Sequence, residues 1–224
     1  AHTTQDSVIP VPRPRSSGPR EAAALAVLRR PEPDSARLLE ALRAGQPGAA
    51  ASLYDTFEGD LNRLVWRLLG SASDHDDVVQ HVFLAVLRSV DRVRDAEALS
   101  GWVRAIAVNT VRSEIRKRRL RRVFLGDPVE DFDRFPGAAD DLEGRDLLRR
   151  VYAVFDMMPA NERLAFQLRY VEELGLPEAA DAAGCSLATF KRRLVRAETR
   201  FRALARRDPT LRARLGSRFD RGSE

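Results

Sequence analysis

Residues 177–194 read PEAADAAGCSLATFKRRL. The proline suits the first turn of a short helix, and the alanines that follow leave a narrow surface that a neighbouring helix can approach closely. Gly184 permits a left-handed turn, and Ser186 can cap the next helix. Phe190 and Leu194 lie one turn apart and would hold that helix to its core. The pattern predicts a helix-turn-helix, a motif whose second helix enters the major groove of DNA.

The N-terminal turns of the second helix carry side chains that can bond to base edges or phosphates. These residues are Thr189, Lys191, Arg192 and Arg193. The alternative interpretation is a helical hairpin that binds nothing, because such patterns also occur without DNA binding. Cys185 is expected to be a small buried residue of the turn, since nothing around it in the sequence suggests a nucleophile or a metal site.

Helical periodicity recurs on both sides of this motif, and the alternating apolar pattern of strands is missing. We therefore predict an all-α fold. The expected helix starts in the first half are Ser35, Pro47, the capping box of Ser73 with Asp76, and Ala96. Gly70 is expected to end the second of these helices, because glycine is favoured just past a helix C-terminus.

These helices group into two modules, residues 35–122 and 142–208. Residues 123–141 have the composition of a linker, with glycine and proline among acidic residues. Residues 1–34 are rich in Pro, Arg and Ser, and we expect a flexible extension, because the prolines break any long helix. The tail at 209–224 is polar and is expected to fray.

Charge is distributed unevenly along the chain. Residues 112–122 hold seven Lys or Arg against one Glu, and residues 191–207 hold eight against one. Residues 127–146 are the reverse, with eight Asp or Glu against two Arg. One basic helix is often only a solvated face, but two of them, one inside a helix-turn-helix, favour binding to nucleic acid.

The composition agrees with a helical protein that has a polyanionic partner. Hydrophobic residues make up 44% of the 224 residues, enough for a buried core, and the formal net charge is +5. A basic excess favours a polyanion through attraction and counterion release. The single cysteine excludes an intrachain disulfide and suits a reducing cytoplasm. No apolar run reaches membrane-spanning length and the first residues lack the apolar core of a secretory signal, so we expect no membrane insertion.

Four segments, taken in order, match the motifs of one family. The segment at 74–83, DHDDVVQHVF, carries an acidic signature, and WVRAIAVNT at 102–110 forms the helix after it. The later segments are MPANERLAFQLRYV at 158–171 and LATFKRRLVRA at 187–197. Together they resemble regions 2 and 4 of the sigma-70 family of bacterial RNA polymerase sigma factors. Regions 1 and 3 of larger members have no counterpart, which indicates the extracytoplasmic-function (ECF) subgroup. The resemblance implies a region 2-like helical bundle and a region 4-like helix-turn-helix domain, joined by the acidic linker.

The resemblance implies that the helix after residue 73 docks on the clamp helices of core RNA polymerase. Asp77 and Gln80 lie three residues apart on one face of that helix, and acidic neighbours would complement a basic partner. The residues carried over to this contact are Asp74, Asp76, Asp77, Gln80 and Phe83. A second interpretation of the acids is that they stabilise the helix dipole, but this does not explain Gln80. His81 stands where the family usually has glutamate, and no second ligand near it suggests a metal site.

The resemblance also assigns residues to the −10 promoter element. The loop at 92–97 falls where the family captures a base flipped from the non-template strand, and its polar groups can pair with such a base. The residues assigned are Arg94, Asp95 and Glu97 in the loop, and Asn109, Arg112 and Arg116 on the strand-facing side of the next helix. Trp102 could stack on a base, but a tryptophan at this helical spacing is more often a core residue.

For the −35 element, the resemblance carries over residues of the recognition helix. They are Thr189, Lys191, Arg192, Arg193 and Arg196. Arg192 stands where the family often has serine, which indicates an unusual base preference.

The function implied by the resemblance is transcription initiation with recognition of two promoter elements. The first module would bind the polymerase clamp and melt the −10 element. The second would read duplex −35 DNA while resting on the polymerase flap, and the acidic linker would thread toward the active-site cleft. The expected partners are core RNA polymerase, promoter DNA and, as is common in the family, an anti-sigma factor. The sequence shows no P-loop, metal-ligand cluster or nucleophile constellation, so we expect neither an enzyme nor a cofactor.

Two other functions remain open from the sequence. A helix-turn-helix regulator acting as a dimer would explain residues 160–207, but not residues 74–83 or the acidic linker, and co-purification with core polymerase would distinguish it. A helical protein-interaction adaptor with solvated basic faces would not show salt-sensitive DNA binding that is lost in Lys191→Ala/Arg192→Ala.

Overall fold

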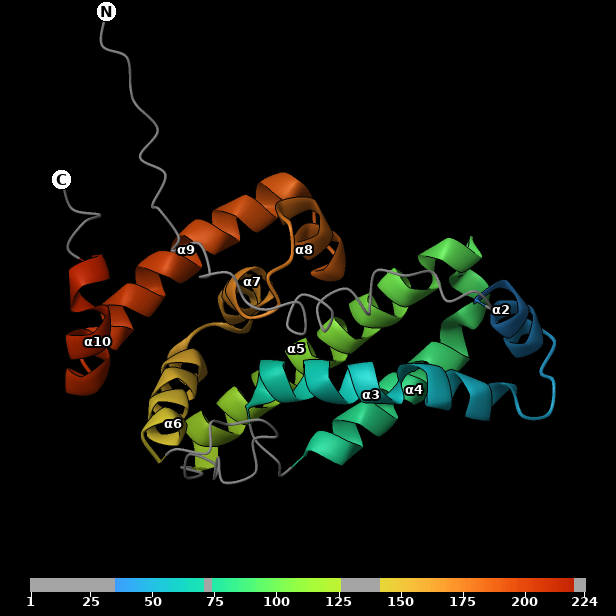
Figure 1. The fold of residues 1–224 in the computed structure, drawn as a ribbon, viewed down its shortest axis with the longest axis horizontal. Helices are drawn as coiled ribbons and strands as arrows, with labels where there is room; N and C mark the ends of the chain where they lie inside the picture. Colours follow the sequence, from blue (N-terminus) through green and yellow to red (C-terminus); the bar gives the residue numbers. More distant parts are fainter. Residues whose placement is uncertain (1–34, 71–73, 126–141, 220–224) are drawn as a thin grey trace, which may run out of the picture.

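The computed structural model describes residues 35–70, 74–125 and 142–219 (Figure 1). Within these ranges every regular element is a helix and no strand occurs, which confirms the predicted all-α class. Among the same residues, none of the helices combines the length and the apolar character needed to cross a bilayer. The predicted N-terminal extension and most of the predicted linker fall outside the described residues.

The N-terminal module is a bundle of three long helices with a shorter helix at one end (Figure 1). Its elements are α2 (Ser35–Arg43), α3 (Ala49–Leu69), α4 (His75–Ser89), the 3-10 turns η2 (Val90–Arg92) and η3 (Ala96–Ala98), and α5 (Leu99–Leu125). The helices α3, α4 and α5 pack against one another, and α2 packs on α3 and the two 3-10 turns. The α5 helix runs three residues beyond the module end expected at residue 122.

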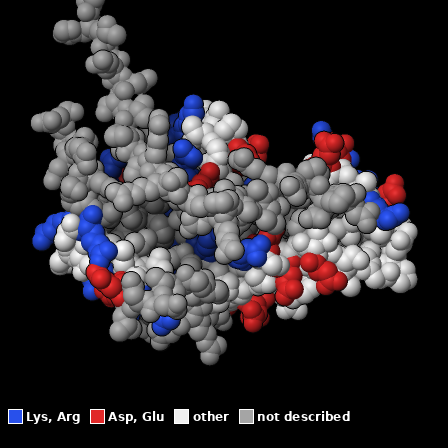
Figure 2. Space-filling view, viewed as in Figure 1, with Lys and Arg blue, Asp and Glu red and all other residues white. Residues whose placement is uncertain are grey.

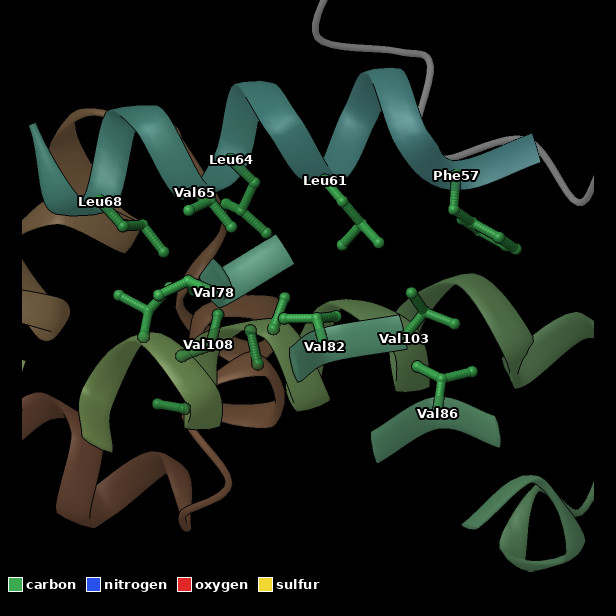
Figure 3. Packing of buried hydrophobic residues seen from close by; sticks show 14 of the residues in the cluster. Phe57, Leu61, Leu64, Val65, Leu68, Val78, Val82, Val86, Val103 and Val108 are labelled. Carbon is green, nitrogen blue, oxygen red and sulfur yellow. The ribbon is translucent and has the colours of Figure 1, made fainter. Parts of the chain in front are cut away.

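The core of this bundle lies between the apolar stripes of its three long helices. Five α3 side chains point toward α4 and α5 (Figure 3). They and their partners, each at most 3% exposed, are Phe57, Leu61, Leu64, Val65 and Leu68 from α3, Val78, Val82 and Val86 from α4, and Val103 and Val108 from α5. The period of the stripe is that of a helix that buries one face, in agreement with the helical periodicity of the sequence.

The predicted end of α3 at Gly70 holds, whereas the predicted starts at Pro47 and Ala96 shift to Ala49 and Leu99, the latter after the 3-10 turn η3. Gly70 ends α3 in the left-handed conformation, φ 77°, and its N–H donates to the Trp66 carbonyl at 2.8 Å. Pro47 was expected in the first turn of this helix, but α3 begins two residues later, after Gly48 at φ 86°. The helix α4 begins at His75, directly after Asp74. Ser73, the first residue of the expected capping box, lies outside the described residues.

The C-terminal module is a second bundle whose longest helix lies across the others (Figure 1). Its elements are α6 (Leu142–Met157), α7 (Ala160–Tyr170), α8 (Leu176–Ala182), α9 (Leu187–Ala205) and α10 (Pro209–Phe219). An aromatic cluster joins α6, α7 and α9: the Phe166 and Phe201 rings stack with centroids 4.5 Å apart, and Phe155 lies 5.6 Å from each. The module therefore has an apolar centre of its own.

The prediction that the tail frays from Pro209 is wrong for the described part of the tail. Residues 209–219 form α10, and Leu211 is fully buried against the aromatic cluster. Asp208 caps the helix: its Oδ1 accepts from the Leu211 N–H at 2.9 Å, which lowers the pKa of the carboxyl, and its Oδ2 pairs with Arg150 at 2.9 Å. A capping aspartate followed by proline at the first helical position starts a helix even when most of its residues are polar.

The two modules are in contact along α5. This helix packs on α7 and α8, and α3 also packs on α7. One buried apolar cluster continues from Leu68 and Val108 in the N-terminal module to Leu164, Leu168 and Ala180 in the C-terminal module. The sequence did not predict this contact.

Replacing Leu211 by alanine should lower the free energy of unfolding by about 2–4 kcal/mol, because a fully buried leucine leaves a cavity. Far-UV circular dichroism during urea unfolding would measure it, since both tryptophans, Trp66 and Trp102, lie in the other module. The exposed neighbour Arg212 supplies the control, and Arg212→Ala should change stability little. Equal effects of the two substitutions would contradict the role of α10.

Candidate nucleic-acid interface

The helix-turn-helix expected from the sequence is formed by α8 and α9. Gly184 adopts φ 61° in the turn. Ser186 precedes α9, and its Oγ accepts from the Thr189 N–H at 3.3 Å. Ala179 and Ala180 are buried, and the narrow helix they belong to packs on both α9 and α5. The predicted turn, cap and close helix approach are therefore confirmed.

Two polar pairs and the aromatic cluster fix the orientation of α9. The Tyr170 hydroxyl donates to Glu198 at 2.5 Å, and burial together with this carboxylate raises the pKa of the phenol. Two residues further along α9, Arg200 Nε donates to Glu162 at 2.5 Å. Both pairs join α9 to α7. These contacts fix how α9 is rotated, and therefore which of its side chains face solvent.

The residues assigned to −35 DNA divide between two directions. Lys191, Arg192 and Arg196 are exposed. Thr189 is half-buried and accepts from Arg192 at 3.3 Å, which orders that arginine over the first turn. Arg193 is half-buried. Burial lowers the pKa of the Arg112 guanidinium, and the nearby charge of Arg193 lowers it further. Three of the five cations and polar groups thus face solvent, and Arg193 faces the N-terminal module.

The loop residues assigned to the −10 element line a surface hollow. Arg94, Asp95 and Glu97 are exposed and line it from one side, and α2 closes the other side. The hollow measures about 800 Å³. Arg43 of α2 donates to the Val93 carbonyl and so ties the loop to α2. Trp102 is half-buried and packs on the apolar core, which agrees with its interpretation as a core residue.

The other residues assigned to −10 DNA follow one face of α5, and this face is turned toward the C-terminal module. Arg112 donates to the Ala183 carbonyl at 2.5 Å. A Cβ built on Gly184 would lie 4.0 Å from Asn109 Oδ1. Arg116 is exposed and lines a small hollow with Pro159, the residue before α7. The structure therefore places Asn109 and Arg112 against the helix-turn-helix and not beside the 92–97 loop.

The face of α4 assigned to polymerase docking is largely open to solvent. Asp76, Asp77 and Gln80 are exposed, and acidic side chains gather over α3 and α4 on the visible side of the molecule (Figure 2). Asp74 is half-buried and pairs with Arg118 at 3.2 Å and Arg121 at 3.1 Å. Its charge is thus partly neutralised within the chain.

Phe83 departs from the docking assignment because its side chain is only 7% exposed. The ring belongs to the core and packs against Tyr54 at 4.9 Å between centroids. Three exposed apolar residues near this face were not assigned from the sequence: Tyr54, Leu84 and Leu87. Leu84 and Leu87 continue the three- and four-residue spacing of Asp77 and Gln80 along α4. This spacing could have identified them in the sequence as part of the same helix face.

Two family models match this chain. The model described as sigma-70 region 2 covers residues 53–121, and the model described as sigma-70, region 4 covers residues 148–201. RNA polymerase sigma factor SigV of Bacillus subtilis is 30% identical over 138 residues, which cover 62% of this chain and 80% of that relative.

This chain belongs to the ECF group of the sigma-70 family.

Further comparisons agree with this assignment. ECF RNA polymerase sigma factor EcfG of Rhodopseudomonas palustris is 31% identical over 145 residues, which cover 61% of this chain and 74% of that relative. The fold matches the sigma factor RpoE of Bartonella quintana, solved in complex with the anti-sigma factor NepR, with a TM-score of 0.51 and 23% identity over 70% of this chain and 97% of that chain. Region 2 therefore lies in the N-terminal module and region 4 in the C-terminal module.

The family gives the chain its function: it is a sigma factor that binds core RNA polymerase and directs it to promoter DNA, and it is not itself an enzyme. The dimeric regulator would leave the region 2 match at 53–121 unexplained, and the adaptor would explain neither match. Among the described residues, no three side chains of His, Cys, Asp or Glu are grouped as a metal site would need. Cys185 is a half-buried free thiol in the helix-turn-helix.

Removing the cap of the recognition helix should destabilise its first turn. We expect Ser186→Ala to cost about 1 kcal/mol, and to speed hydrogen exchange at the Thr189 amide, which donates to the lost oxygen. Nuclear magnetic resonance exchange measurements would show this. Thr199→Ala is the matched control, because that hydroxyl bonds only within the middle of the same helix; faster Thr189 exchange in the control as well would contradict a local cap.

Proposed function

We propose that this sigma factor divides promoter recognition between its modules. In this proposal the C-terminal module reads duplex −35 DNA, and the N-terminal module binds the polymerase clamp and holds the melted −10 strand. The observation that carries it is the capped helix α9, whose first turns present Lys191, Arg192 and Arg196 to solvent. Cations at this part of a helix-turn-helix reach guanine edges and phosphates.

The hollow beside the 92–97 loop supports capture of a single base by the N-terminal module. A base leaves the stack only where hydrogen bonds and contacts compensate for unstacking. The guanidinium of Arg94 and the carboxylates of Asp95 and Glu97 offer both donors and acceptors at one opening. Trp102 is proposed to support this site from within the core and not to stack on the base.

The exposed stripe of α4 supports polymerase docking. Asp77 and Gln80 are followed on the same face by Leu84 and Leu87, so charged, amide and apolar groups form one continuous surface. A basic partner with an apolar centre fits this surface, because charge complementarity guides encounter and apolar burial holds the complex.

An anti-sigma factor is proposed as a third partner, on the single ground that the Bartonella quintana sigma factor is held by one. The polymerase flap is proposed to contact the C-terminal module.

Reversing the charge of α4 should release the protein from polymerase. Asp77→Lys combined with Gln80→Ala is expected to weaken binding to core RNA polymerase about tenfold or more, because it places a cation against a basic partner. Fluorescence anisotropy of labelled sigma factor would measure the affinity.

Asp181→Lys serves as the control for this substitution, since it reverses an exposed carboxylate on α8 in the other module. Its polymerase affinity should stay close to that of the unchanged chain. If the α4 variant also binds normally and still supports run-off transcription, α4 is not the docking face.

Removing two cations from the first turns of α9 should abolish −35 selectivity. Run-off transcription with core polymerase on a promoter library would first identify the consensus. On promoters recovered in this way, Lys191→Ala/Arg192→Ala should reduce transcription about tenfold or more, because each specific base contact contributes about 1–3 kcal/mol.

The matched control removes two cations from the end of the same helix. Arg206 and Arg207 are exposed and lie about 22 Å along the axis from the first pair. Arg206→Ala/Arg207→Ala should keep the consensus. A consensus lost equally in both variants would mean that α9 contributes only general charge.

A further inference from the structure

We propose that Glu40 of α2 selects the base that is captured beside the 92–97 loop, and that this base carries an exocyclic amine. The Glu40 carboxylate would accept a hydrogen bond from that amine, so adenine, cytosine or guanine would be preferred to thymine. The inference rests on the proposed base capture, to which it adds a second wall and a base preference.

The hollow beside the loop has one wall made by α2. The residues that this helix contributes lie three or four positions apart on one face: Ala36, Leu39 with Glu40, and Arg43. Residues 94–98 form the opposite wall. At about 800 Å³, the hollow falls in the range of about 300–1,000 Å³ that is usual for sites holding small molecules. A flat base can therefore enter between a helix and a loop, and both walls offer it polar groups.

The α2 wall is held in place by contacts on both of its sides. Leu39 and Leu42 are buried in the core of the N-terminal module, and α2 packs on the two 3-10 turns, η2 and η3. The Arg43 guanidinium donates to the Val93 carbonyl at the start of the loop. Glu40 is exposed, so its carboxylate reaches the hollow from a helix whose position is fixed.

The family resemblance assigns no residue of α2 to DNA. The matched region 2 model begins at residue 53, whereas α2 ends at Arg43. The −10 residues assigned from the sequence begin with Arg94. Folding joins the two walls across about 50 residues of sequence, so the contribution of α2 is visible only in the structure.

The chemistry of the lining favours one class of base. Three carboxyl groups line the hollow, those of Glu40, Asp95 and Glu97, and an ionised carboxylate accepts hydrogen bonds but donates none. A flipped base is recognised at its Watson–Crick edge. Adenine, cytosine and guanine have an amine at this edge that donates to a carboxylate, whereas thymine has one N–H between two carbonyl oxygens.

The loop supplies the complementary donor. The Arg94 guanidinium donates only, and it can bond to the ring nitrogen or carbonyl oxygen that lies beside the amine of the base. A base with an amine therefore suits both walls. Thymine would bring its carbonyl oxygens against carboxylates, and such contacts between acceptors are repulsive.

Removing the Glu40 carboxylate should change the base preference at one −10 position. Run-off transcription by core polymerase carrying the unchanged chain or Glu40→Ala would be compared on a library of −10 sequences. At the captured position the unchanged chain should favour a base with an amine over thymine about tenfold, which is the discrimination that a specific contact to a base edge provides. Glu40→Ala should remove most of this preference.

Two further variants make the comparison specific. Arg94→Ala identifies the captured position independently, because Arg94 lies on the opposite wall of the same hollow. Asp91→Ala is the matched control, since Asp91 is an exposed carboxylate on η2 outside the lining and should keep every preference. Glu40 is exposed and alanine is a good helix former, so Glu40→Ala should fold.

A base analogue separates contact with the amine from a general effect of α2. On premelted promoter templates, the preferred base would be replaced by an analogue that lacks only the amine: purine for adenine, hypoxanthine for guanine or 2-pyrimidinone for cytosine. The analogue should weaken binding of the polymerase complex about tenfold with the unchanged chain and with Asp91→Ala. It should have almost no effect with Glu40→Ala, because the partner of the amine is already absent.

The possible failures can be told apart. Equal losses on the analogue in all three proteins, or a preference for thymine at the position identified by Arg94→Ala, would overturn the role of Glu40 and leave base capture standing. If Arg94→Ala changes the preference at no −10 position, base capture in this hollow is refuted, and the role of Glu40 with it.

Discussion

The carbonyl groups at the end of α3 determine how the two halves of this sigma factor meet. A helix terminus that is buried must find donors outside itself, and here Arg163, Gln167 and Tyr152 supply them from about 85 to 100 residues further along the chain. These three side chains lie on α6 and α7, which also carry α9 through the aromatic cluster and the Tyr170–Glu198 bond. The position of the recognition helix is therefore set, through a short series of contacts, by the end of a helix in the region 2 bundle.

Much of the local structure was predictable because it depends on interactions between neighbouring residues. The left-handed turns at Gly70 and Gly184 and the cap at Ser186 follow from the conformational preferences of single residues. The buried stripe of α3 follows from helical spacing. The same logic, applied to Asp208 and Pro209, would have revealed α10, but the polar composition of the tail was given more weight than its capping pair.

The contact between modules was not predictable in the same way. Its acceptors are backbone carbonyls, which every residue has, so no sequence pattern marks them. The donors are recognisable in the sequence. Arg163 and Gln167 lie four residues apart, beside Leu164 and Leu168, on the face of α7 that is buried and would be expected to be apolar. Polar residues at such positions indicate a buried partner without naming it. For the candidate site, the exposure of Lys191, Arg192 and the α4 stripe could be anticipated. The burial of Phe83 also follows from its helical spacing with Val79 and Val86, and only the resemblance assigned it to the docking face.

The continuity of α5 has a mechanical consequence. This single helix of 27 residues spans about 40 Å. Its first half is embedded between α3 and α4, and its later turns carry the contacts with α7 and α8. No hinge interrupts it, so the helix acts as a rigid lever: a tilt of about 10° at the embedded end would displace the far end by roughly 7 Å, more than one helical turn. Small rearrangements of the bundle around the embedded end would thereby be amplified into movements large enough to break hydrogen bonds at the opposite end.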